Sequence, residues 1–179
     1  MSNLRCFIAS LLVAFICALT SVAFAYYPRF WKGDTNYPHI WGHMGAAFYL
    51  DKSSIKVKIN KPPYYIITAQ VIVVLDSDYP GERRYSNDKE AYKNYSHEYF
   101  YDEDEMDMRE YNPSKDTWHY LGPTYSNAES GRSMAVGEAV FYVAMSRKFY
   151  GNYLWKDTDY LDEVKYWDMF ADSFYKDLR

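Results

Sequence analysis

The chain has 179 residues and a formal net charge of −4 at pH 7, with 24 acidic and 20 basic side chains. Because it is mildly acidic and has no block of Lys and Arg, we expect neither nucleic acid nor an anionic membrane surface as a partner. Aromatic residues make up 20% of the chain, and 21 of them are tyrosines. A tyrosine has an apolar ring and a polar hydroxyl, so this composition suits both half-buried sheet faces and recognition surfaces.

The first 25 residues have the three-part layout of a secretory signal peptide. Arg5 precedes an apolar run over residues 6–22, and Ala23-Phe24-Ala25 matches the small-x-small pattern that a signal peptidase cuts. A membrane-spanning helix would need about 20 apolar residues and usually a charged stop after them. We therefore expect export, cleavage after Ala25 and no stable membrane insertion afterwards.

Both cysteines, Cys6 and Cys17, lie within this expected signal. The remainder, residues 26–179, would then have no disulfide, no thiol nucleophile and no cysteine metal ligand. Its length suits a single domain that buries roughly 70% of the surface of its unfolded chain. An exported domain without disulfides must be stabilised by its core, which favours a bacterial protein of the periplasm, the cell surface or the medium.

The segment after the expected signal, residues 26–44, predicts an extended arm pinned to the domain by its aromatic rings. Its prolines and tryptophans are Pro28, Trp31, Pro38 and Trp41. Residues 46–50 predict a short strand, which ends before a turn at Ser53-Ser54. A further strand follows from Ile55 to Ile59, where apolar residues alternate with lysines as in a half-buried antiparallel strand.

Residues 60–63 (Asn-Lys-Pro-Pro) end that strand, and residues 64–75 predict the strongest strand in the chain. This segment is rich in Ile, Val and Tyr and is apolar on both faces, which favours a central place in a sheet. Shorter strands and the turns between them are predicted at 97–101, 102–105 (acidic turn), 106–111, 112–116 (turn) and 117–121. Their regular spacing predicts a meander.

Beyond the strands, the apolar residues recur at helical spacing. One helix, capped by Ser133 or a neighbour, is predicted to end at Gly151. A second is predicted to start near Asp157-Thr158, with acidic residues in its first turns. Strands followed by helices predict an α+β domain, an antiparallel meander of five or six strands with two C-terminal helices packed on one face.

No motif predicts a catalytic residue, a metal site or a cofactor, and we expect none. His39 and His43 have the spacing of two ligands on one helical face, but Pro38 and Gly42 argue against a helix there. The acidic stretch 102–107 resembles a calcium loop but lacks the required glycine and the final glutamate. A solvated hairpin tip is the better interpretation, and calcium binding stays open.

Two carboxylates and two histidines suggest an alternative function. The chain would then be a cell-envelope hydrolase that uses a carboxylate and a histidine as acid and base. They are Glu98, Glu138, His97 and His119. Glu138 lies in an apolar helical stretch, where pairing with Arg132 or Lys148 is the plainer interpretation. A recessed pocket that holds such a pair would favour the enzyme, and a shallow aromatic patch would favour a binding domain.

The aromatic residues carry the alternative that we favour, an exported non-enzymatic binding domain of the bacterial envelope or surface. Tyrosine and tryptophan stack on sugars and form hot spots of protein contacts, so the expected ligand is a protein or a carbohydrate outside the cytosol. The candidate binding residues are Trp31, Trp41, Tyr99, Tyr101, Trp118 and Tyr120. The same rings could equally fill a small core. A third alternative is a structural envelope protein that self-associates by a sheet edge, and the oligomeric state stays open.

Two stretches together resemble an uncharacterised group of small exported bacterial proteins. They are residues 48–57 with 62–67, and residues 134–142 with 148–151. More distantly, the pattern Tyr-Leu-Asp-x-x-Ser-Ile at residues 49–55 is similar to the surface-adhesin protein E family. That resemblance spans roughly residues 46–151 and implies a small sheet-plus-helix domain that binds matrix proteins of a host.

Overall fold

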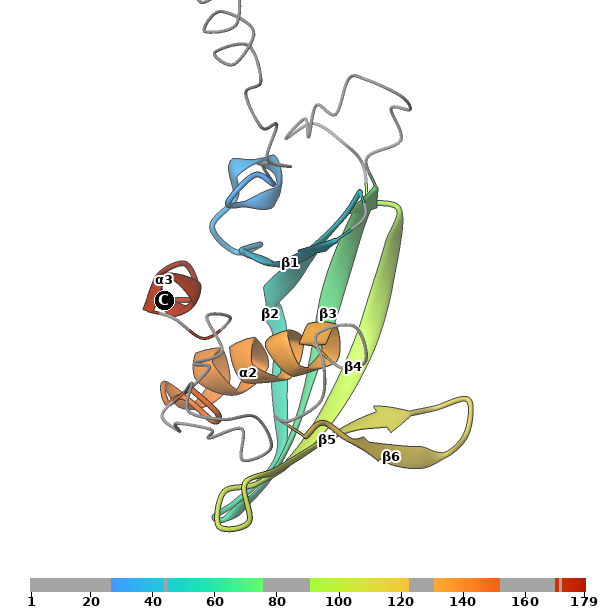
Figure 1. Ribbon diagram of the computed structural model, residues 1–179, viewed down its shortest axis with the longest axis vertical. Coiled ribbons are helices and arrows are strands. Elements are labelled where there is room, and N and C mark those ends of the chain that lie inside the picture. The colour runs from blue at the N-terminus through green and yellow to red at the C-terminus, as the bar shows by residue number, and fades with distance from the viewer. Residues whose placement is uncertain (1–26, 44, 76–90, 123–130, 152–169, 171) are drawn as a thin grey trace, which may run out of the picture.

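The computed structural model describes residues 27–43, 45–75, 91–122, 131–151, 170 and 172–179 (Figure 1). Six strands form one antiparallel sheet in which each strand pairs with its neighbours in the chain. They are β1 (His39–His43), β2 (Ala46–Lys61), β3 (Tyr64–Leu75), β4 (Lys93–Asp102), β5 (Asp107–Asn112) and β6 (Thr117–Tyr120). The predicted meander is therefore confirmed, with six strands.

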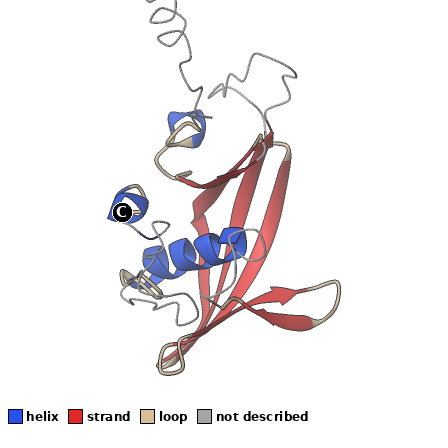
Figure 2. Cartoon of the chain, in the orientation of Figure 1, coloured by secondary structure: helices blue, strands red, loops and turns tan. Residues whose placement is uncertain are grey.

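A helix, α2 (Arg132–Met145), packs across one face of this sheet, which confirms the α+β class (Figure 2). The 3-10 turn η1 (Trp31–Gly33) precedes β1, and a short helix, α3 (Asp172–Lys176), lies against α2. The expected signal, residues 1–25, and the predicted start of the second helix near residue 157 lie outside the described residues. Among the described residues, no helix combines the length and the apolar character needed to span a membrane.

The main core lies between the sheet and α2. Along β3 the residues alternate, so that Tyr65, Ile67 and Val71 point toward the helix and are buried. The largest buried side chains around them are Leu50, Tyr99, Tyr101, Met108, Met134, Phe141, Phe149 and Tyr150. β3 is the third of six strands and is covered on much of both faces, which explains why its sequence is apolar throughout.

The predicted turn at Ser53-Ser54 is wrong, because β2 runs through it as one strand with a bulge. The pairing with β3 skips from Asp51 to Lys56. Inside the bulge, Asp51 Oδ1 accepts the backbone N–H of Ser53 at 3.0 Å, and Ser54 Oγ accepts the N–H of Gln70 in β3 at 2.7 Å. These side chains replace the missing ladder bonds, so the polar residues that favour a turn here keep the strand paired.

The opposite face of the sheet carries a second, smaller core at its β1 end. Its buried members are Ala47, Tyr49, Ile72 and Val74, and the residues packed on them are Tyr27, Trp31, Tyr37 and Ala91. The described part of the predicted arm, residues 27–43, thus contacts the sheet through the rings of Tyr27, Trp31 and Tyr37. Its last described part is β1, which pairs with β2 as an edge strand.

Helix α2 ends at Met145, before the predicted end at Gly151. Ser146 adopts a left-handed conformation (φ 55°) and donates its N–H to Tyr142 O at 2.8 Å, which closes the helix. The predicted side-chain cap at Ser133 is wrong as well, because the N-cap position is Gly131 and no side chain caps it.

Candidate functional site

Four aromatic side chains form a row on the sheet face opposite α2. We call them the aromatic strip, and they are Tyr64 of β3, Phe100 of β4, Tyr111 of β5 and Trp118 of β6. The ring centroids of Tyr64 and Phe100 are 6.2 Å apart, those of Phe100 and Trp118 6.2 Å, and those of Tyr111 and Trp118 5.3 Å. The strip therefore crosses four strands as one contiguous set of rings.

The strip is open to solvent, unlike the second core on the same face. Tyr64 is 49% exposed and Trp118 is 38% exposed. Two ion pairs flank the rings, Lys58 with Glu98 at 2.5 Å and Arg109 with Asp107 at 2.5 Å. An apolar centre with charged side chains at its rim is the usual composition of a protein contact surface.

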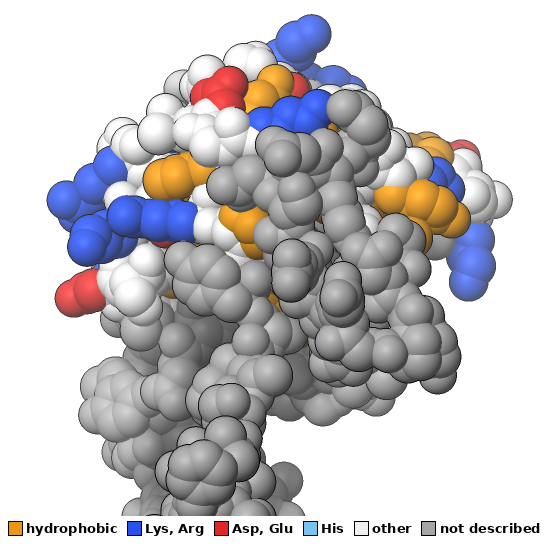
Figure 3. Space-filling view, turned by 90° about the horizontal axis from the view of Figure 1, so that it is seen from above, with side chains coloured by type: hydrophobic (Ala, Val, Ile, Leu, Met, Phe, Trp, Pro, Cys, Tyr) orange, Lys and Arg blue, Asp and Glu red, His pale blue; other side chains and the backbone are white. Residues whose placement is uncertain are grey.

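Charged side chains also lie at the end of the molecule that is farther from β5 and β6 (Figure 1, Figure 3). In the view from above, Lys and Arg side chains project at the rim, and the visible hydrophobic side chains form separate patches between them (Figure 3).

The strip reaches the outer edge of the sheet at β6. All four residues of β6 are exposed and none is charged or a proline, so this edge is protected only by the short length of the strand. Leu121 N–H bonds Met108 O at 2.8 Å, and the antiparallel alternation then directs the backbone N–H and C=O of Trp118 away from β5. Within the described part of the chain, no strand pairs with β6 on that side.

The six sequence-predicted binding residues fall in three different environments. Trp118 and Tyr120 are exposed, at 38% and 41%. Tyr99 and Tyr101 are fully buried under α2 and so are not available to a partner. Trp31 packs on the second core and Trp41 on the main core, both partly buried.

Sequence reasoning missed Tyr64, Phe100 and Tyr111 of the strip. In β4, Phe100 lies between the two buried tyrosines and so points to the opposite face. The register pairs Phe100 with Ile66 and Tyr111 with Trp118, which brings the rings together across the strands. The strict alternation within β4 separates Phe100 from Tyr99 and Tyr101. It identifies the exposed side chains only when the face that α2 covers is known.

The two buried tyrosines of β4 have structural roles. Tyr101 Oη donates to the carbonyl oxygen of Gly137 in α2 at 2.8 Å. Burial raises the pKa of Tyr101 and of Tyr99 well above the ordinary value, so both hydroxyls stay protonated. Gly137 permits this close packing, since a Cβ at that position would overlap Met108 Sδ.

The histidines and carboxylates of the enzyme alternative do not combine as predicted. His97 Nδ1 lies 2.5 Å from Oε1 of Glu110, whereas Glu98 pairs with Lys58 on the other face. Burial raises the pKa of Glu110, but His97 and, more weakly, Ser133 and Arg132 outweigh it, so the pKa is lowered. This pair is largely buried, with 13% and 21% of the two side chains exposed.

Glu138 is fully buried and binds backbone rather than Arg132 or Lys148, so the predicted pairing is wrong. Its carboxylate accepts the N–H of Phe149 at 2.9 Å, the N–H of Tyr150 at 2.7 Å and the hydroxyl of Tyr175 at 2.8 Å. Burial raises the pKa of this carboxyl, and the hydrogen bonds oppose the rise. A carboxylate saturated by such donors holds the chain together and has no free oxygen for chemistry.

The acidic turn after β4 is confirmed as a hairpin tip. Asp102 Oδ1 accepts the backbone N–H groups of Asp104 at 3.1 Å and Glu105 at 3.3 Å, so this carboxylate caps its own turn. His39 lies in a strand rather than a helix. The described residues contain no group of three or more His, Cys, Asp or Glu side chains placed to hold a metal ion.

The geometry therefore offers one extended surface, the aromatic strip with the adjoining edge of β6, and two carboxylates engaged in the interior. Comparisons of this chain with protein-family models, with curated proteins and with solved structures find no match.

Proposed function

We propose that this chain is an exported domain of the bacterial envelope or surface that binds an extended polypeptide through the aromatic strip and the edge of β6. The observation that carries the proposal is the exposed ring of Trp118, which contacts both Phe100 and Tyr111 and lies on the edge strand of the sheet. The signal layout of residues 1–25 supports the export, and the adhesin resemblance supports the class of function.

The angles between the rings favour a polypeptide over a carbohydrate. The planes of Phe100 and Trp118 differ by 67°, and those of Tyr111 and Trp118 by 51°. A sugar chain stacks on ring faces that lie nearly in one plane, and only Tyr64 and Phe100 approach this arrangement, at 20°. Tilted rings instead form notches that accept the side chains of a protein partner.

The edge of β6 supports an extended partner in particular. A strand added beside β6 would bond the outward N–H and C=O of Trp118, and its alternate side chains would lie next to Trp118, at the outer end of the aromatic strip. On β5, next to β6, the ion pair of Arg109 with Asp107 adds charged side chains to the same face.

Selection from a displayed library of random peptides tests this function. The full chain should enrich peptides with apolar residues at alternating positions, because only every second side chain of an added strand faces the strip. Trp118→Ala should weaken the binding of the selected peptides roughly tenfold or more, as expected for a central aromatic contact. Tyr92→Ala is the matched control, because Tyr92 is 65% exposed but lies outside the strip.

Three results would contradict the proposal. They are the absence of any enriched peptide, equal binding by the Trp118→Ala and Tyr92→Ala variants, and binding to a glycan array in place of peptides. If the molecular mass in solution rises with protein concentration, and is lower for the Trp118→Ala variant, then the edge of β6 binds a second copy of the chain. Recovery of the unprocessed chain from the cytoplasm would contradict the proposed export.

A further inference from the structure

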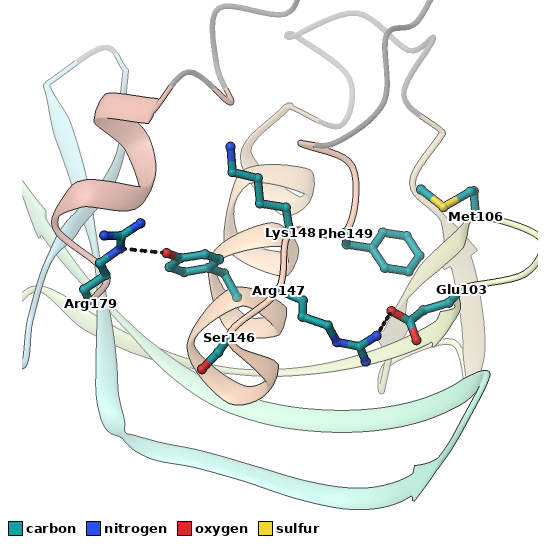
Figure 4. Close-up of a pocket in the computed structure, with 8 residues that line it drawn as sticks. Glu103, Met106, Ser146, Arg147, Lys148, Phe149 and Arg179 are labelled. Carbon is teal, nitrogen blue, oxygen red and sulfur yellow. Dashed lines mark hydrogen bonds and ion pairs between the residues drawn. The ribbon is translucent and has the colours of Figure 1, made fainter.

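A pocket of about 450 Å³ lies at the C-terminal end of α2, on the helix-covered side of the sheet (Figure 4). It is separate from the aromatic strip. Its walls come from the β4–β5 turn, from the end of α2 with the loop that follows, and from Arg179. Its volume is within the range of sites for small molecules.

Three cationic side chains and one carboxylate line this pocket, in a chain whose net charge is negative. Arg147 Nη1 pairs with Glu103 Oε1 at 2.8 Å. Lys148 Nζ pairs with Asp172 Oδ1 at 3.1 Å. Two of the three cations therefore already have an ion-pair partner, whereas Arg179 forms no ion pair within the described ranges. A hydrogen bond to a tyrosine hydroxyl and, more weakly, the nearby charge of Asp172 raise the pKa of Arg179.

The Arg179 side chain is exposed and makes one hydrogen bond to the side chains that the structure describes. Its Nε donates to Tyr142 Oη at 3.0 Å, as Figure 4 shows, and the main-chain oxygen of Arg179 accepts Lys52 Nζ at 3.2 Å. Among the described residues, the two Nη groups of Arg179 form no hydrogen bond or ion pair. Their planar fork matches the two oxygens of a carboxylate.

Part of the remaining wall is apolar, beside the polar side chains of Tyr142 and Ser146. Met106 and the ring of Phe149 lie together on the side of the pocket away from Arg179 (Figure 4). Phe149 is rigidly placed, because its ring packs on Phe141 and Tyr150 in the main core. The carboxylate of Glu103 lies on the same side and disfavours a second negative charge on the ligand.

We propose that this pocket binds a small monocarboxylate with an apolar body. The carboxylate is bound by the fork of Arg179, and the apolar part contacts Met106 and Phe149. This ligand is independent of the polypeptide partner, because the two sites lie on opposite faces of the sheet.

Isothermal titration of the full chain with 4-phenylbutyrate tests the site. The neutral 4-phenylbutyramide and inorganic phosphate should each bind at least about tenfold more weakly, because the first lacks the charge and the second lacks the apolar body. Arg179→Gln should weaken 4-phenylbutyrate binding roughly tenfold or more. Arg179→Lys, which keeps the charge but loses the fork, should weaken it by a smaller factor.

Lys115→Gln is the control variant, because Lys115 is an exposed cation in the distant β5–β6 turn. Its binding should equal that of the unchanged chain, and circular dichroism should show all variants folded. The proposal is overturned if the acid and the amide bind equally, if Arg179→Gln and Lys115→Gln are indistinguishable, or if 4-phenylbutyrate gives no heat at millimolar concentration.

Discussion

The two ends of the sheet face opposite α2 present similar residues in different surroundings. At the β1 end, Tyr49 is only 2% exposed, because Tyr27, Trp31 and Tyr37 of the preceding segment pack over it. At the β6 end, Trp118 is 38% exposed. The chain thus covers one end of this face with its own aromatic residues and leaves the other, equally aromatic, open to solvent, where we propose that a partner binds.

The largest expected difference between the two ends concerns a matched pair of tyrosines. Tyr49→Ala should lower the free energy of unfolding by about 4 kcal/mol, because it leaves a cavity in the second core. It also removes the hydrogen bond from Tyr49 Oη to Pro28 O. Tyr64→Ala should cost about 0.5 kcal/mol, since half of that ring is exposed. Urea denaturation measures both, and equal losses would contradict the comparison.

Acid should weaken the covered end selectively. His39 stacks on Tyr27, with ring centroids 5.0 Å apart, and burial lowers its pKa from 6.5 to about 4, although a hydrogen bond with the Trp41 backbone opposes this. The folded chain therefore holds a neutral imidazole that the unfolded chain protonates. This stability is present above pH 6.5 and falls by about 3 kcal/mol as the pH drops toward 4.

The unfolding free energy of His39→Phe, measured from pH 7 to pH 4, should decline less than that of the unchanged chain. Other groups titrate alike in both proteins. Because the pKa of Glu110 is lowered, its contribution to stability is lost only below the ordinary pKa of a glutamate. The pKa of Glu138 is raised, so its contribution to stability increases as the pH falls. His119→Gln is the control, because His119 is exposed. Parallel curves for the unchanged chain and His39→Phe would exclude His39 as the cause.

A smaller effect is expected where the preceding segment lies on β1. A Cβ on Gly42 would overlap the ring of Tyr27, so Gly42→Ala should displace that ring and cost about 2 kcal/mol. In a Tyr27→Ala background the same change should cost less than about 0.5 kcal/mol. Thermal unfolding of the unchanged chain, the two single variants and the double variant measures the coupling between Gly42 and Tyr27. Additive losses of stability would show that the ring of Tyr27 does not cover this end.

The smallest effect on stability is expected at the open end. Trp118→Ala should lower the unfolding free energy by less than about 1 kcal/mol, because the ring contacts only partly buried neighbours. Denaturation and peptide binding should be measured on the same preparation. A loss as large as that of Tyr49→Ala would make the strip part of the core rather than a contact surface.

The strands were largely predictable from the sequence, because their periodicity is local. Residues 64–75 match β3 at both ends, and the lysine alternation of residues 55–59 lies within β2. The bulge at Ser53-Ser54 was not predictable, since the same residues favour a turn in isolation. Only the partner strand, through Gln70, decides between the two.

The candidate site was predictable only in part. Period-two alternation separates Tyr99 and Tyr101 from Phe100, but it does not say which set α2 will cover. The carboxylate of Glu138 in α2 binds backbone groups of Phe149 and Tyr150, beyond the helix C-cap at Ser146. That contact joins residues distant along the chain, and no local pattern contains it.

The side chain of Glu138 connects three separate segments of the chain. Its carboxylate joins the middle of α2, the loop at Phe149 and Tyr150, and Tyr175 of α3. The pocket near Arg179 is walled by two of these segments, although Glu138 itself does not line it. The shape of that pocket thus depends on Glu138, which a ligand in the pocket would not contact. Replacing Glu138 by a neutral residue would weaken the packing of the pocket walls and leave the charged residues of its lining unchanged.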